Sequence, residues 1–137
     1  MSEFISQNLV LVALFLASGT MLIMPSFTKL FSGAKEIGTL GATRLMNDGH
    51  ALVLDIRDNT EFNAGRIPKS KNIPIADIDK RIDEIAKFKG KPVIIACKTG
   101  TRSAAALRTL KQQGFSDLYQ LQGGVTAWQQ ASLPLEK

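Results

Sequence analysis

The chain has 137 residues, with 17 Lys and Arg against 12 Asp and Glu, which gives a net charge of +5. This length allows one domain of about 100 residues with an appended segment. The single cysteine and single histidine exclude an intramolecular disulfide and a zinc site built from clustered Cys and His. No basic run is interleaved with aromatic residues, so nucleic acid is not an expected partner.

The N-terminal stretch predicts a membrane anchor. After a short tail (1–8), the run from Leu9 to Met24 carries no charge and approaches the roughly 20 residues that a transmembrane helix needs. A secretory signal is one alternative, but the tail contains no Lys or Arg to form a basic n-region. A buried core helix is the other alternative to a membrane anchor. We therefore expect a retained transmembrane helix over residues 9–25.

The flanking charges predict the orientation of this helix. Lys29, Lys35 and Arg44 follow it, whereas no basic residue precedes it. The positive-inside rule then places the N-terminus outside and the remaining chain in the cytoplasm, most simply at a bacterial inner membrane. Residues 26–36 are predicted to form a juxtamembrane linker, which is either a plain tether or a segment whose basic residues meet anionic headgroups.

The remainder, 37–137, is predicted to be one α/β domain. Short apolar runs predict strands, and runs of helix formers or apolar residues at helical spacing predict helices between them. Such alternation implies a parallel sheet with helices on both faces. The expected strands are 36–38, 51–56, 71–74, 92–96 and 117–121, and the expected helices are 43–47, 59–63, 76–88, 103–113 and 125–130.

The only cysteine lies in the turn between the fourth predicted strand and the following helix. The turn reads Cys97-Lys98-Thr99-Gly100-Thr101-Arg102-Ser103. In open α/β sheets this edge is where ligands bind, and the free N–H groups and dipole of a helix N-terminus favour a thiolate. Lys98 and Arg102 add positive charge, and Gly100 allows a sharp turn on which N–H groups converge. The sequence therefore predicts a nucleophile within an anion-binding loop.

This loop resembles the active-site loop of the rhodanese-like sulfurtransferases, written C-[RK]-x-G-x-R-[ST]. The resemblance extends over about residues 37–137 and implies a single rhodanese-like domain with a parallel five-stranded sheet. Its further motifs are Leu54-Asp55-Ile56-Arg57, Glu61-Phe62, Gly65-Arg66-Ile67-Pro68, Asn72-Ile73-Pro74, Gly123-Gly124, Trp128 and Leu133-Pro134.

The resemblance implies that Cys97 is the catalytic nucleophile. It would take the outer sulfur of an anionic donor such as thiosulfate as a persulfide and pass it to cyanide, a small thiol or a protein cysteine, without a cofactor or metal. Backbone N–H groups and hydroxyls of the loop would hold the persulfide, and its two cations would attract the donor. The substrate-binding residues are thus predicted to be Lys98, Thr99, Gly100, Thr101, Arg102 and Ser103.

The same resemblance assigns Asp55 and Arg57 a supporting role, as a polar network beside the loop. Glu61 and Arg66 are candidates to join it, although Arg66 stands where the family commonly has histidine.

Two alternative functions remain open from the sequence. One is a rhodanese-like module at the membrane that binds a partner protein without turnover. The other is a cysteine phosphatase or arsenate reductase. Cysteine phosphatases resemble Cys-x5-Arg, whereas Cys97 and Arg102 are separated by only four residues, which favours a target smaller than a phosphoryl group.

Overall fold

The structure is a computed structural model that describes residues 1–31, 34–100 and 102–137; the side chains of 24–31 also lie outside the description. The chain divides into two compact units, Met1–Gly33 and Ala34–Lys137. The predicted linker over 26–36 therefore falls partly outside the described residues, as does Thr101 of the cysteine loop.

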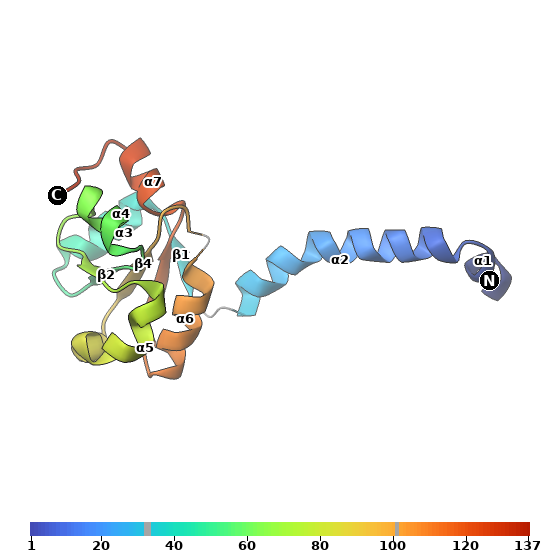
Figure 1. Cartoon of the computed structure of the whole chain (residues 1–137), viewed down its shortest axis with the longest axis horizontal. Helices are drawn as coiled ribbons and strands as arrows, with labels where there is room; N and C mark the ends of the chain where they lie inside the picture. The colour runs from blue at the N-terminus through green and yellow to red at the C-terminus, as the bar shows by residue number, and fades with distance from the viewer. Residues whose placement is uncertain (32–33, 101) are drawn as a thin grey trace. The chain divides into compact units, whose positions relative to one another are not determined.

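The N-terminal unit contains two helices, α1 (Ser2–Gln7) and α2 (Leu9–Phe31) (Figure 1). Apolar side chains such as Leu9, Val10 and Phe15 are exposed along α2. The transmembrane helix predicted over 9–25 is not supported, because no helix in the described part of the chain is long and apolar enough to cross a membrane.

The second unit is built on a five-stranded parallel sheet with the order β1-β5-β4-β2-β3. This finding confirms the predicted parallel sheet. The central strand β4 and its neighbour β2 are buried along their whole length because they are apolar and covered on both faces. The strands are β1 (Lys35–Ile37), β2 (Leu52–Asp55), β3 (Lys71–Asn72), β4 (Val93–Ala96) and β5 (Leu118–Leu121).

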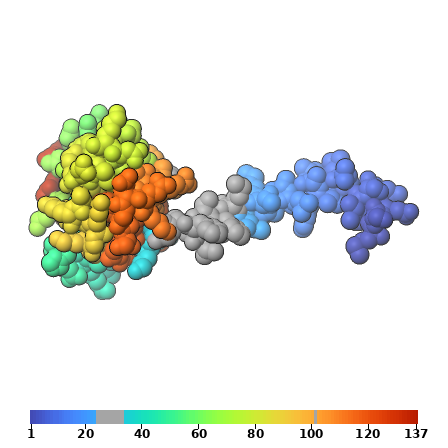
Figure 2. Space-filling model, turned by 90° about the horizontal axis from the view of Figure 1, so that it is seen from below, coloured from blue at the N-terminus to red at the C-terminus, as the bar shows by residue number. Residues whose placement is uncertain are grey.

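Helices cover both faces of the sheet (Figure 1). On one face, α3 (Thr39–Asn47) and α7 (Gly124–Gln130) bury side chains such as Ala42, Val125 and Trp128 against the sheet. On the other face lie α5 (Ile78–Arg81), the 3₁₀ segment η2 (Ile82–Phe88) and α6 (Ser103–Gln112). Figure 2 shows the segment around α5 and η2 beside α6 on the surface of the unit.

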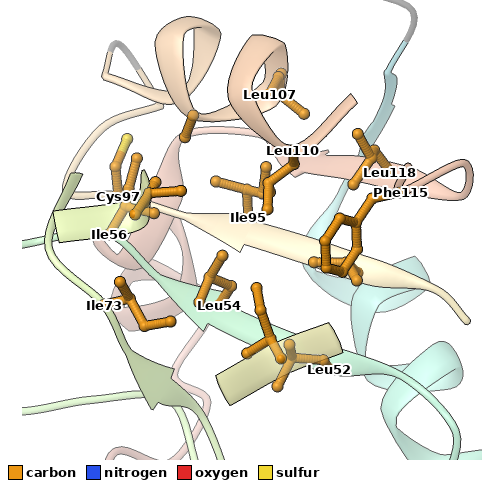
Figure 3. Close-up of a cluster of buried hydrophobic side chains, with 14 residues drawn as sticks. Leu52, Leu54, Ile56, Ile73, Ile95, Cys97, Leu107, Leu110, Phe115 and Leu118 are labelled. Carbon is orange, nitrogen blue, oxygen red and sulfur yellow. The ribbon is translucent and has the colours of Figure 1, made fainter. Parts of the chain in front are cut away.

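The register of the central strands sets the position of the cysteine. Asp55 of β2 pairs with Ala96 of β4, and the N–H of Ile56 donates to the carbonyl of Ala96 at 2.9 Å. Cys97 and Ile56 therefore leave the sheet side by side at its carboxyl edge, as Figure 3 shows. The residues that follow β2 and β4 meet at this edge.

The segment predicted as one helix over 76–88 is instead three short turns. The 3₁₀ turn η1 (Ile75–Asp77) follows Pro74 and leads into α5 and then η2. Ile78 and Ile85 are buried as the helical spacing predicted. The β-branched isoleucines and the three aspartates of this segment have low helix propensity, so docking of the isoleucines on the sheet determines the local winding.

Candidate active site

The thiol of Cys97 is buried, but polar groups lie next to it. Its side chain is 1% exposed and packs at the end of the apolar cluster that includes Ile56 and Ile73 (Figure 3). The N–H of Gly100 donates to Sγ at 2.7 Å, and the Ser103 hydroxyl lies 3.6 Å from Sγ. Burial alone is typical of an inert structural cysteine. Two donors directed at the sulfur instead suit a site that holds negative charge on sulfur.

Gly100 is fixed at both of its backbone polar atoms. While its N–H faces Sγ, its carbonyl oxygen accepts from Nε2 of Gln120 at 2.7 Å. Gly100 also has a φ of +90°, which glycine adopts without strain. Gln120 is held in β5, where it is adjacent to Ile95 of β4. The neighbouring strand therefore anchors the glycine that directs an N–H at the sulfur.

The start of α7 holds the first residues of the loop. The N–H of Val125 donates to the carbonyl of Cys97 at 2.8 Å, and that of Thr126 donates to the carbonyl of Lys98 at 3.0 Å. Gly124, with φ of +59°, allows the close approach that these bonds need.

Arg102 forms an ion pair with Glu61 of α4 (Asn59–Ala64). Its guanidinium donates to both carboxylate oxygens at 3.1–3.3 Å. The Arg102 hydrogen bonds and charge lower the pKa of Glu61, and Glu61 raises the pKa of Arg102. Glu61 also forms a capping box with Asp58, its backbone N–H donating to the Asp58 carboxylate at 2.9 Å. Arg102 is thus directed toward α4, and its charge is balanced.

Asp55 and Arg57 form the buried polar network predicted at the end of β2. Their side chains are joined at 2.7–3.0 Å, with Asp55 0% and Arg57 6% exposed. Arg57 also donates to the carbonyl of Gly65, and the Asn72 amide donates to the carbonyls of Asp55 and Arg57. This network fixes the chain after β2 beside the cysteine loop.

Arg66, which the sequence made a candidate member of this network, does not contact Asp55 or Arg57. Its guanidinium lies 4.7 Å from the ring centre of Phe62, and its backbone pairs with Glu136 near the C-terminus. The side chain of Lys98 is exposed and forms no ion pair among the described residues. The structure therefore brings Gly100 and Ser103 to the sulfur, and directs Lys98 and Arg102 elsewhere.

Sequence reasoning did not identify Gln120, Asn72 or the partner of Arg102. The pattern Asp58-Asn59-Thr60-Glu61 is a capping-box signal that fixes the orientation of Glu61. No comparable local signal marks Gln120 or Asn72, because their partners are 20 and 15–17 residues away.

The family follows from comparison with known proteins. The sequence model of the rhodanese-like domain matches residues 41–131. The chain belongs to the rhodanese-like family. It is 31% identical over 134 residues to the uncharacterized protein YibN of Escherichia coli, covering 97% of this chain and 94% of YibN.

Other members of the rhodanese-like family carry functional names or solved structures. Thiosulfate sulfurtransferase GlpE of Pseudoalteromonas translucida is 36% identical over 97 residues, covering 71% of this chain and 90% of GlpE. The crystal structure of a rhodanese-related protein from Thermoplasma volcanium superposes with a TM-score of 0.66 at 28% identity, covering 74% of this chain and 97% of that one. The fold and some relatives named as sulfurtransferases thus agree with the cysteine loop.

Proposed function

We propose that this rhodanese-like protein is a sulfurtransferase that carries sulfane sulfur as a Cys97 persulfide. The observation that supports it best is the pair of donors, the Gly100 N–H and the Ser103 hydroxyl, directed at Sγ. A thiolate and a terminal persulfide sulfur both carry negative charge, so the same donors stabilise the enzyme before and after loading.

The reaction has two displacement steps. In the first, the Cys97 thiolate attacks the outer sulfur of thiosulfate; the S–S bond of the donor breaks, and its electron pair leaves with sulfite. In the second, an acceptor such as cyanide or a thiolate attacks the terminal sulfur of the persulfide. The bond to Sγ then breaks, and its electron pair regenerates the Cys97 thiolate. Burial of Sγ shields the intermediate from water and from unrelated thiols.

The Arg102–Glu61 pair favours sulfur transfer over phosphatase chemistry. A phosphate-binding loop requires an arginine that donates two bonds to phosphoryl oxygens. In this chain both terminal nitrogens of Arg102 already donate to the Glu61 carboxylate.

The decisive experiment is mass spectrometry of the full-length protein after incubation with thiosulfate. We expect one added sulfur on Cys97, released as thiocyanate when cyanide is added, and neither event in Cys97→Ser. A protein that gains no sulfur but retains specific partners would be a binding module instead. Transfer by Cys97→Ser, or Cys97-dependent hydrolysis of aryl phosphates without a persulfide, would contradict the proposal directly.

A further inference from the structure

Four exposed lysines lie together where η2 and α6 end. These residues, named the lysine patch, are Lys87, Lys89, Lys91 and Lys111. The two ends are joined through the backbone, since the N–H of Ser116 donates to the carbonyl of Lys89 at 3.5 Å. Phe88 lies between two of the lysines, with the ammonium groups of Lys87 and Lys91 at 5.3 and 5.7 Å from its ring centre. The patch therefore combines positive charge with a half-buried aromatic ring.

The ends of the helical segments account for only two of the four lysines. Lys87 and Lys111 lie in last turns, where a cation interacts favourably with the helix dipole. Lys89 and Lys91 lie beyond the end of η2. The neighbouring Asp117, whose carbonyl is bonded to the start of β4, is half-buried. No lysine of the patch forms an ion pair with any residue that the structure describes, so their charge is uncompensated.

The lysine patch lies at the amino edge of the sheet, where the chain enters the second unit. Strand β4 begins two residues after Lys91, and the parallel strand β1 begins at Lys35. Ala34, directly before β1, packs on the same apolar cluster as Phe88. Cys97 leaves β4 at the opposite, carboxyl edge. A surface that contacts the patch would therefore leave the cysteine loop accessible.

The helix that precedes this point of entry is apolar on all sides. In the part of α2 whose side chains the structure describes, nine large apolar residues are each at least 54% exposed. Six of them form two consecutive runs, 9–11 and 14–16, and consecutive helical side chains are rotated by about 100°. The Thr20 hydroxyl donates to the carbonyls of Leu16 and Ala17, so it is satisfied within the helix. A helix without a polar face is suited to apolar surroundings.

We propose that the lysine patch binds the anionic headgroups of a lipid bilayer and that the apolar side chains of α2 enter the same bilayer. A lipid surface supplies negative charge for the patch and hydrocarbon for α2. A nucleic acid supplies only the charge, and a second copy of the chain supplies only apolar surface. The proposal does not require α2 to cross the bilayer, and it is independent of the sulfur chemistry. It directs the Cys97 edge of the sheet away from the lipid.

The test measures binding of the full chain to vesicles by flotation, with phosphatidylcholine alone and with phosphatidylcholine plus phosphatidylglycerol. The anionic preference is the ratio of the two partition coefficients. The double variant Lys89→Gln/Lys91→Gln should reduce this ratio about 25-fold, because each lysine near an anionic surface contributes about fivefold. The matched control Lys80→Gln/Lys137→Gln removes the same charge from exposed lysines outside the patch and should change the ratio less than about twofold.

The part assigned to α2 has its own pair of variants. Leu14→Glu places a charge in α2 and should reduce binding to phosphatidylcholine vesicles at least about tenfold. Leu40→Glu in α3 is the matched control, because Leu40 is 66% exposed and Leu14 is 62% exposed. Circular dichroism of every variant checks that the fold is retained.

The outcomes separate this proposal from its alternatives and from the proposed function. Equal losses of anionic preference in the two double variants would assign the effect to net charge and overturn the patch. Unchanged binding of Leu14→Glu to phosphatidylcholine would overturn the part assigned to α2. Self-association, or binding to a DNA duplex, without binding to anionic vesicles would replace the lipid by a second copy or a nucleic acid. Normal vesicle binding in a protein that gains no sulfur from thiosulfate would contradict the sulfurtransferase function and support the lipid surface.

Discussion

Gly124 packs so closely on the carbonyl oxygen of Cys97 that a β-carbon at position 124 would overlap this oxygen. Such an atom would also lie 2.8 Å from the carbonyl carbon and oxygen of Lys98. The adjacent N–H groups of Val125 and Thr126 donate to these same two carbonyls. The start of α7 therefore sets the backbone of the cysteine loop through contacts that only glycine permits.

We predict that Gly124→Ala disrupts both stability and sulfur transfer. The left-handed φ of +59° and the overlap with the Cys97 carbonyl both oppose a side chain. The expected loss in the free energy of unfolding is about 2–4 kcal/mol, measured by denaturant titration, with thiosulfate:cyanide transfer reduced at least about tenfold. Gly90→Ala is the control, since a β-carbon there meets no atom within 4 Å. Equal behaviour of the two variants would show that α7 does not hold the loop.

Gln120 provides a second prediction. Its amide donates to the Gly100 carbonyl, and Gly100 in turn donates to Sγ. Gln120→Met keeps the length of the side chain but removes the donor, so we expect transfer to fall about three- to tenfold and stability to fall by only about 1 kcal/mol. Gln122→Met is the control, because Gln122 bonds to Glu36 on the surface. Full activity of Gln120→Met would mean that Gly100 holds its position without this bond.

The sequence was sufficient to predict the parallel sheet and the position of Cys97 at its edge. Both depend on local information, namely apolar strands followed by polar turns and helix formers. The partners of Gly100 and Arg102 could not be predicted, because Gln120 and Glu61 are 20 and 41 residues away and their contacts arise only when β5 and α4 are placed. The direction of Lys98 likewise depends on where α7 packs. The cytoplasmic location and the transfer of sulfur from a donor such as thiosulfate to a thiophilic acceptor stay predictions.

We predict that Arg57→Ala strongly destabilises the fold. This change leaves the fully buried Asp55 carboxylate without its cation and removes the bond to the Gly65 carbonyl. Breaking a buried ion pair on one side costs about 3–5 kcal/mol, which urea titration should detect as a lower midpoint. Arg108→Ala, on the exposed side of α6, should change stability by less than about 0.5 kcal/mol. A similar small change for Arg57→Ala would show that Asn72 and the backbone suffice to hold this edge.

The Glu61–Arg102 pair should make the stability of the fold depend on pH. Arg102 lowers the pKa of Glu61 below its usual value of 4.5 in the folded chain, so the pair contributes stability above about pH 4.5 that is lost as the pH falls further. The Glu61 and Arg102 side chains are 28% and 39% exposed, so solvent screens this contribution. Glu61→Gln should therefore be slightly less stable than the unaltered protein at about pH 7, and the difference should shrink as the pH falls below about 4.5 and also in about 1 M salt.

Glu84 supplies the matched control for this pH effect. Arg81 and Lys71 lower the pKa of Glu84 from 4.5 to about 2, so the Glu84 carboxylate contributes stability above about pH 4.5 that is lost as the pH falls toward about 2. Glu84→Gln should therefore be slightly less stable than the unaltered protein at about pH 7, and this difference should shrink over the same pH range. The kinetics should separate the two variants. Removing the Glu61 charge leaves Arg102 unbalanced beside the loop, so KM for the thiosulfate dianion should fall about two- to threefold, whereas Glu84→Gln should leave it unchanged. An unchanged KM in Glu61→Gln would mean that Arg102 has no electrostatic effect on the donor, and an identical shift in both variants would assign the effect to net charge alone.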